Sequence, residues 1–216
     1  MAMTPVYIRL TRTLPEPGTA ASRFWGSPAL PPGSPYPVYS DADGVHPYFF
    51  LCQINLEEFA PYDVDKRLPD RGLLSFFAKI DHYLGYWGGQ EGIGGQISGR
   101  DAVKVMYFPS CEGLAEVRPE DVRDIPAVPD GLRMDFSLTA APLSDDHAVF
   151  ARPDHRPWET WDHPFEDREI LLQVDSFEGD DFSLLFMDAG VLDFLISPSD
   201  LEQRRFDDVR AVVLSS

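Results

Sequence analysis

The sequence predicts an α+β fold that is mainly antiparallel β-sheet with few helices, with an internal duplication of two similar halves. Three observations predict it. Short runs of apolar, β-branched and aromatic residues recur along the chain, each bounded by Gly, Pro or Asp. The 16 glycines and 20 prolines favour many turns and long ordered loops. Finally, a glutamine inside an apolar run occurs twice, in Phe50–Asn55 and in Ile170–Ser176.

The first predicted element is a strand at Val6–Leu10, where apolar and polar residues alternate. Seven prolines follow between positions 15 and 37, and they exclude a regular helix or a central strand from residues 11–44. That segment also contains large apolar side chains, namely Phe24, Trp25, Leu30, Tyr36 and Tyr39. Large apolar side chains are uncommon in a solvated linker, so we expect an ordered loop that packs over the core.

From residue 48 onward the pattern is mostly strand. We expect strands near Tyr48–Ile54, Leu73–Ile80, Val103–Phe108, Leu132–Thr139, Glu169–Asp175, Phe182–Met187, Val191–Ile196 and Val209–Leu214. The clearest helix begins at Ser199, because Ser199 and Glu202 have the spacing of a capping box. A shorter helical turn is expected after Asn55.

The repeated glutamine phrase has a consistent continuation. Gln53 is followed by Gly72 in "GLLSFF", and Gln173 is followed by Gly190 in "GVLDFL". The offsets between the copies are 173 − 53 = 120 and 190 − 72 = 118, close enough for one register. More loosely, Trp25 and Pro28 in "WGSP" match Trp161 and Pro164 in "WDHP". We therefore expect a single domain over residues 1–216 with two pseudo-repeats, roughly 22–110 and 158–214.

Two roles are open for the glutamines. A buried amide needs partners for its oxygen and its NH₂ group, so Gln53 and Gln173 could each clamp the backbone of the loop that crosses its own half. Alternatively, both amides face a central cleft between the halves and hold a ligand. Trp25, in the proline-rich loop, belongs to the same candidate site.

The charge narrows the choice of partners. With 36 acidic and 18 basic residues the formal net charge is −18, which repels phosphate backbones and anionic membranes and attracts basic proteins. Solubility alone is the other explanation. No apolar run reaches the roughly 20 residues that cross a bilayer, and the N-terminus lacks the pattern of a secretory signal. We therefore expect a cytoplasmic protein with Cys52 and Cys111 as thiols.

The sequence motifs predict no catalytic residue, no metal site and no cofactor. Gly94–Gly99 has the spacing of a phosphate-binding loop, but Asp101 stands where a Ser or Thr is required and would repel phosphate. We expect this glycine-rich stretch to connect two strands, with Tyr86 and Trp87 as candidate partner contacts. "DADG" at 41–44 lacks the first Asp and the last Glu of a calcium loop.

The nucleophiles and histidines carry no stronger signal. Cys111 follows a strand and precedes a glycine, but Glu112 beside it would raise the pKa of a thiol. The five histidines form no H-x-x-x-H pair, and His155, Asp162 and His163 could meet only through tertiary folding.

Several blocks resemble the YwqG-like family of bacterial proteins, a family of unknown function. They are "SRFWGSPALPPG", "FFLCQINLEEF", "LPDRGLLSFF", "VMYFP", "ILLQVDS" and "DAGVLDFLISPSDLEQRRFDDVRAVV", and together they cover most of residues 22–213. The resemblance implies an α+β fold rich in antiparallel strands, in one cytosolic unit with an internal repeat. It implies no established activity and supplies no catalytic residues.

These observations favour a non-enzymatic binding protein whose acidic, aromatic-bearing surface engages a basic protein partner. A bacterial immunity protein that neutralises a basic toxin would fit this description. The alternative is a small-ligand-binding protein or an enzyme that uses a cleft between the two repeats, with Gln53 and Gln173 facing inward.

Overall fold

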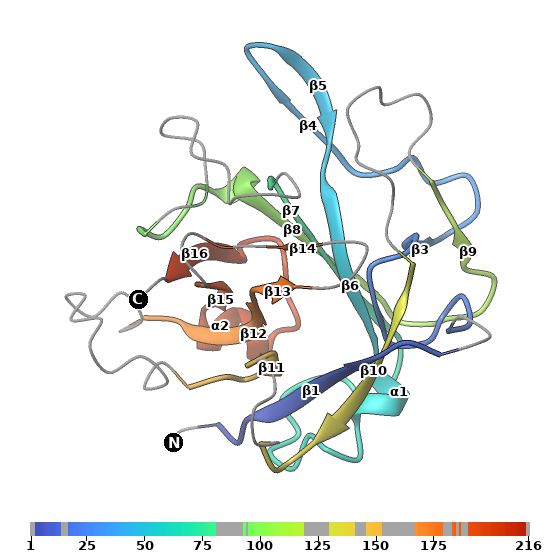
Figure 1. Ribbon diagram of the computed structural model, residues 1–216, viewed down its shortest axis with the longest axis vertical. Helices are drawn as coiled ribbons and strands as arrows, with labels where there is room; N and C mark the ends of the chain where they lie inside the picture. The colour runs from blue at the N-terminus through green and yellow to red at the C-terminus, as the bar shows by residue number, and fades with distance from the viewer. Residues whose placement is uncertain are drawn as a thin grey trace.

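Ten strands form one antiparallel sheet that curls into a nearly closed barrel (Figure 1). The computed structural model describes residues 3–13, 17–80, 93, 95–118, 130–140, 146–152, 167–178, 183–184, 186 and 190–214. In their order across the sheet, the strands are β16 (Arg210–Leu214), β15 (Val191–Ile196), β12 (Glu169–Asp175), β11 (Ala148–Val149), β1 (Val6–Thr11), β10 (Leu132–Ser137), β2 (Arg23–Phe24), β6 (Phe49–Asn55), β7 (Leu73–Ala78) and β8 (Val103–Phe108). The predicted fold class, mainly antiparallel sheet with few helices, is confirmed.

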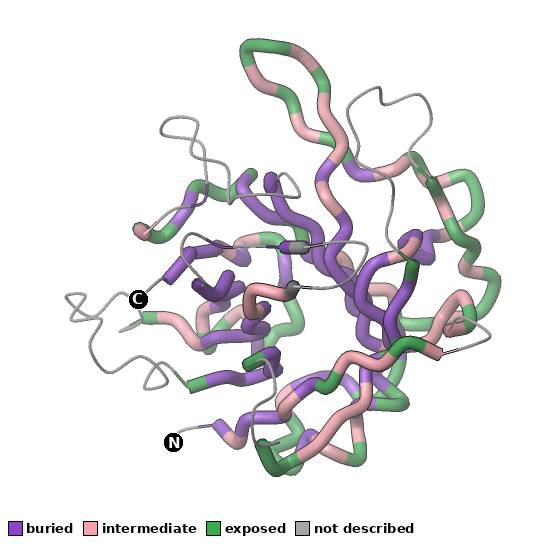
Figure 2. The backbone as a smooth tube through the Cα atoms, in the orientation of Figure 1, coloured by how far each residue is buried: buried purple, intermediate pink, exposed green. Residues whose placement is uncertain are grey.

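Smaller elements lie around the barrel. Three two-stranded sheets pair β3 (Ala29–Leu30) with β9 (Ala115–Glu116), β4 (Val38–Asp41) with β5 (Gly44–Pro47), and β13 (Phe177–Glu178) with β14 (Ser183–Leu184). The helices of the described residues are α1 (Leu56–Phe59), α2 (Pro198–Glu202) and the 3-10 turn η2 (Arg100–Ala102). The β4–β5 hairpin projects away from the barrel, whereas the barrel strands are mostly buried (Figure 2).

Most predicted strands are present, and β8, β12 and β15 have the predicted bounds. One predicted strand differs. Within 182–187 the structure describes residues 183, 184 and 186, of which Ser183–Leu184 form β14, outside the barrel sheet.

Two residues of the first loop form a central strand, so the exclusion predicted from the prolines is wrong for them. Arg23 and Phe24 form β2, which lies inside the sheet between β10 and β6. The stretch from 18 to 27 contains no proline, so nothing prevented these residues from joining the ladder. Later in the same loop, Leu30, Tyr36 and Tyr39 pack on the outer face of the sheet.

The two short helices begin at side-chain caps. Asn55 caps α1, where its Oδ1 accepts the N–H of Glu57 at 3.0 Å, as the predicted helical turn after Asn55 requires. In α2 the cap is Ser197 and not the predicted Ser199, since the Oγ of Ser197 accepts the N–H of Asp200 at 3.1 Å. Pro198 explains the shift, because its fixed φ suits the first helical position.

Contacts between the two ends of the sheet close the barrel. Ser98 lies shortly before β8 and exchanges bonds with β16: its N–H donates to the Ala211 carbonyl at 2.8 Å, and its Oγ accepts the Ala211 N–H at 2.9 Å. Arg100 forms an ion pair with Asp208 at 2.9 Å. Inside, the rings of Phe76 and Phe194 meet edge to face with centroids 5.2 Å apart.

The sheet consists of two arms joined by the central pair β1–β10. We call β2–β6–β7–β8 the first arm and β11–β12–β15–β16 the second arm. Both have the same order and direction of strands, and both have a break in register at the same place, between Phe50 and Cys52 and between Ile170 and Leu172. A pseudo-twofold axis therefore relates the arms.

Main-chain hydrogen bonds follow this relation. In the first arm Trp25 N–H donates to the Leu51 carbonyl at 2.7 Å, and in the second Phe150 N–H donates to the Leu171 carbonyl at 3.2 Å. Trp25 and Phe150 also share a left-handed backbone, with φ of 59° and 56°. Phe150 thus occupies the position equivalent to Trp25, and the predicted match, Trp161, lies outside the described residues.

The glycines that marked the repeat have equivalent places as well. Leu56 N–H donates to the Gly72 carbonyl at 2.9 Å, and Ser176 N–H donates to the Gly190 carbonyl at 3.2 Å. Gly72 has φ of 100°, and a Cβ at this position would collide with the Phe108 carbonyl oxygen.

The relation also includes the two central strands. Met134 N–H donates to the Ser22 carbonyl at 3.3 Å, and Ile8 N–H donates to the His147 carbonyl at 2.8 Å. Matching hydrogen bonds thus extend to β1 and β10, and the bounds of the pseudo-repeats, roughly 22–110 and 158–214, stay a prediction. A shared origin of the halves by duplication stays a prediction.

Candidate functional site

Gln53 lies fully buried in β6, and its side-chain amide forms hydrogen bonds with the proline-rich loop. Its Nε2 donates to the carbonyls of Thr19 at 2.7 Å and Ala21 at 2.9 Å. Its Oε1 accepts the N–H of Ala29 at 3.0 Å. One side chain therefore satisfies three main-chain groups on both sides of β2.

Gln173 is buried at the equivalent position of β12. Its Nε2 donates to the Asp146 carbonyl at 2.7 Å, the counterpart of the bond from Gln53 to Ala21. Next to it, the Asp175 N–H donates to Nδ1 of His147 at 3.0 Å. In the first arm the matching bond runs from Asn55 N–H to the Oγ of Ser22 at 2.9 Å.

The two glutamines point away from the barrel interior. Gln53 lies opposite Ser75, which shares a face of β7 with Phe77 of the outer apolar cluster. Gln173 lies opposite Asp193, on the same face of β15 as the outer residues Val191 and Leu195. Each amide thus lies on the outer face of its own arm, and the two do not share a cleft.

Trp25 is buried in the core and does not face solvent. Its indole packs edge to face against Phe24, with centroids 5.3 Å apart, and against Phe177, at 4.9 Å. The other candidate contacts, Tyr86 and Trp87, lie outside the described residues.

A hollow of about 550 Å³ opens between the first half of the chain and β10. It is lined by Thr13, Pro17, Ala21, Ser22, Glu58, Tyr62, Arg133, Met134, Asp135 and Phe136. Glu58 accepts the N–H of Ser22 at 2.9 Å, while Asp135 pairs with Arg133 at 2.9 Å and accepts from Thr11 at 3.1 Å. Sequence reasoning missed this site, because its residues come from three distant segments.

One stretch of the first half of the chain carries acidic side chains only. Residues 24–65 contain six carboxylates, Asp41, Asp43, Glu57, Glu58, Asp63 and Asp65, and no Lys or Arg. Glu57 and Glu58 are exposed on α1 beside the hollow, and neither forms an ion pair with a described residue.

Cys111 does not have the environment of a catalytic nucleophile. Burial raises the pKa of its thiol, and the charges of Glu57 and Glu58 raise it further. The sequence had suggested Glu112 as the cause, whereas the structure brings carboxylates from α1. Burial also raises the pKa of Cys52, which is a core residue of β6.

His147 is buried directly before β11, with its ring centroid 5.3 Å from that of Phe24. Burial lowers the pKa of its imidazole to about 4, so it is neutral at pH 7. Nδ1 accepts the Asp175 N–H, which leaves the ring proton of the neutral form on Nε2. Within the described part of the chain, no group of three or more His, Cys, Asp or Glu side chains has a metal-binding arrangement. The described helices are all too short to cross a membrane.

Comparison with known proteins identifies a family of unknown function. The model of DUF1963, a domain of unknown function, matches residues 22–165 and 145–213. No curated protein matches the chain. Since the matched residues span most of its length, the chain belongs to the DUF1963 family.

Proposed function

We propose that this chain is a non-catalytic binding module that holds a basic protein partner on the acidic surface of its first half. The observation that carries the proposal is the stretch 24–65, with six carboxylates and no Lys or Arg. Such a field favours encounter with a positively charged protein and disfavours nucleic acid. A cytoplasmic location and a place among YwqG-like proteins, including an immunity-type role, belong to this proposal.

The surface beside α1 is the preferred contact. Glu57 and Glu58 form no ion pair with a described residue, whereas Asp135 is already paired with Arg133. The hollow next to them is lined by the rings of Tyr62 and Phe136. A Lys or Arg side chain can insert there, since carboxylates and aromatic faces both attract cations.

In this proposal the glutamines are structural. Gln53 clamps the loop on either side of β2, and Gln173 holds the residue before β11 in the same way. The amide of Gln53 fixes the loop that carries Ser22, whose N–H bonds to Glu58 beside the hollow, and this reduces the entropy lost on binding.

The test is capture of the partner by the tagged chain from native lysate at low salt, followed by a salt ramp and mass spectrometry. We expect one basic protein, in stoichiometric amount. A variant with Glu57→Gln and Glu58→Gln should release it at lower salt. The control variant, Glu202→Gln with Asp207→Asn, removes the same charge from exposed positions near α2 and should elute like the wild type.

Two results would overturn the proposal. One is an empty ramp from a bait that circular dichroism shows to be folded. The other is equal elution of the α1 variant and its control, because the partner would then respond to net charge and not to this surface.

A second candidate function is supported by the hollow itself. Its volume of about 550 Å³ lies within the usual range of small-molecule sites, and both halves of the chain line it. This would be the ligand site between the repeats, but without Gln53 and Gln173. Native mass spectrometry of the purified chain tests it, because a retained small molecule that is lost in Tyr62→Ala would favour this function.

A further inference from the structure

The β4–β5 hairpin presents an apolar face to solvent. Val38 lies opposite Pro47, and Ser40 lies opposite Val45, so these four side chains share one face. Val38 is 50% exposed and Val45 is 67% exposed. This face projects from the molecule and is not part of the barrel core (Figure 2).

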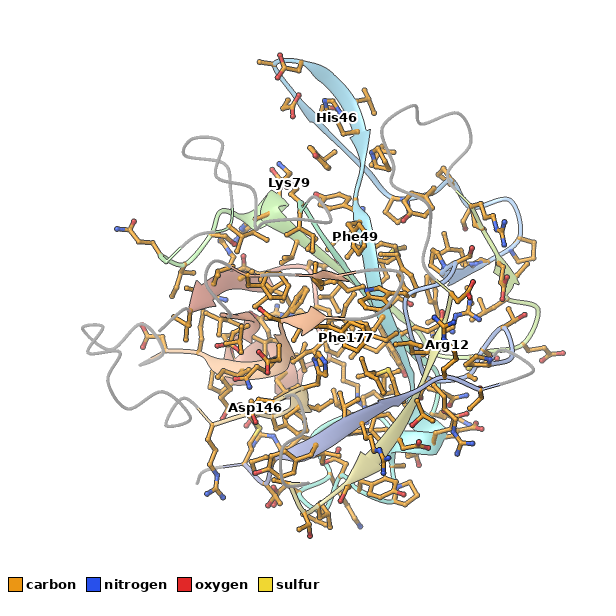
Figure 3. The ribbon with its side chains drawn as sticks, viewed as in Figure 1. Arg12, His46, Phe49, Lys79, Asp146 and Phe177 are labelled. Carbon is orange, nitrogen blue, oxygen red and sulfur yellow. The ribbon has the colours of Figure 1, made fainter. Side chains whose placement is uncertain are left out.

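The other face of the hairpin is anchored to the barrel. The rings of Tyr39 and Tyr48 meet edge to face, with centroids 5.1 Å apart, and Nζ of Lys79 lies 4.6 Å from the centroid of the Tyr39 ring. His46, on the same face, bonds to Asp41 at 3.0 Å. Figure 3 shows His46 on the hairpin and Lys79 at its base. The hairpin is thus a fixed projection with its apolar face outward.

The hydrogen-bond pattern leaves one edge of the hairpin open. Tyr48 N–H donates to the Pro37 carbonyl at 3.1 Å, which makes Pro37 and Tyr48 a hydrogen-bonded pair. Hydrogen-bonded and non-hydrogen-bonded pairs alternate along an antiparallel ladder, so Tyr39 and His46 are the next hydrogen-bonded pair. The main-chain groups of Val38 and Ser40 therefore point away from β5. Within the described residues, none of these outward groups has a bonding partner.

The opposite edge is blocked. Pro47 has no N–H to donate, which is a common way to protect the edge of a sheet. The edge of β4 has no such protection at Val38 and Ser40. An extended segment can therefore add to β4 but not equally to β5.

The charge around this edge selects the occupant. Asp41 and Asp43 lie at the turn of the hairpin, inside the stretch 24–65 that has no Lys or Arg. A second copy of the chain would bring the same carboxylates to the edge and would be repelled. We propose that β4 is a docking edge for an extended, basic segment of a partner protein, with alternate apolar residues of which one covers Val38. This inference rests on the proposed function and adds a second contact to it.

The experiment uses a capped eight-residue peptide of alternating valine and lysine, and a control peptide of alternating valine and glutamate. Hydrogen exchange of the full chain is followed by NMR at low salt. With the lysine peptide, the Val38 and Ser40 amides should exchange at least tenfold more slowly, because they become bonded. The glutamate peptide should change nothing.

A matched pair of variants tests the edge directly. Ser40→Pro removes the outward N–H and should weaken the lysine peptide at least tenfold, whereas Ser40→Thr keeps the N–H and should bind like the wild type. Val64→Thr, at a 54% exposed valine outside the hairpin, should also bind normally. The melting temperature of each variant shows that the fold is retained.

The outcomes separate the two proposals. Peptide binding without protection of Val38 and Ser40 overturns the docking edge, and a partner whose elution still depends on Glu57 and Glu58 leaves the proposed function standing. Failure of both the peptide and the partner to bind overturns both proposals.

Discussion

The two arms of the barrel have the same main-chain geometry but satisfy it with different side chains. Where the first arm has Ser22 as the acceptor of a strand N–H, the second has the buried imidazole of His147. Where Ser75 lies opposite Gln53, Asp193 lies opposite Gln173. The difference teaches that the fold requires an acceptor for the strand N–H of Asn55 and of Asp175 and does not specify which group provides it.

The largest expected effects come from the left-handed residues that both arms share. Trp25→Ala and Phe150→Ala should each lower the free energy of unfolding by about 3–5 kcal/mol, because both rings are buried. Glycine at either position should be about 1 kcal/mol more stable than alanine, since it adopts positive φ without strain. Urea denaturation measures these differences. Alanine variants more stable than the glycine variants would break the equivalence of the two positions.

The glutamines come next. Gln53→Leu strands three main-chain groups and should cost about 3 kcal/mol, whereas Gln173→Leu strands the Asp146 carbonyl and should cost about 1–2 kcal/mol. The exposed Gln203→Leu serves as the control and should change stability by less than about 0.5 kcal/mol. Chemical denaturation ranks the three. Equal tolerance of leucine at 53 and 203 would contradict the clamp.

The second arm uses His147 as an acceptor where the first arm uses Ser22. This difference predicts that the second arm alone makes the free energy of unfolding depend on pH through this position. Burial lowers the pKa of His147 to about 4 from its ordinary 6.5, so the unfolded chain binds a proton that the folded chain rejects between these values. The free energy of unfolding should therefore fall as pH falls from 6.5 to 4, by up to about 1.4 kcal/mol per pH unit from this group.

His147→Ser copies the first arm and should remove this part of the slope. Carboxylates contribute to both proteins and cancel in the comparison. Denaturation at half-unit pH steps provides the measurement, and identical slopes in the variant and the wild type would show that His147 is not the cause.

The smallest expected effect concerns the link between the arms. Arg67, in the first half, forms an ion pair with Glu169 of β12 at 2.9 Å, with both side chains about one-quarter exposed. A double-mutant cycle with Arg67→Ala and Glu169→Ala should give a coupling energy of about 0.5–1 kcal/mol at low salt. A coupling energy that does not fall when the salt concentration is raised would show that the contact is not mainly electrostatic.

The sequence predicted the long strands well, because β6, β7, β12 and β15 each bury a continuous apolar run. It also predicted the paired positions of Gln53 and Gln173. It could not predict β2 and β11, since strands of two residues exist only because both neighbours offer partners. The sequence could not predict for the same reason that His147 accepts the N–H of Asp175 in the second arm.

The candidate site was less accessible to sequence reasoning. The hollow joins residues near 17, 58 and 135, and no local spacing connects such distant segments. The outward apolar face of the hairpin could not be predicted either, because it depends on the pairing of Val38 with Pro47 and of Ser40 with Val45. In the structure Asp41 caps a tight turn, where its Oδ1 accepts the N–H groups of Asp43 and Gly44.

The residues at the centre of the β1–β10 pair are less restricted in one continuous chain than in an assembly of two half-length chains. Arg9 of β1 lies opposite Asp135 of β10, and these two positions are also equivalent under the relation between the arms. In an assembly of two identical half-length chains, the residue at this point would face its own copy, and arginine would meet arginine. A continuous chain is free of that restriction and can place opposite charges on the two sides of the axis. Covalent linkage therefore gives each arm its own sequence, so that one can specialise while the other preserves the scaffold.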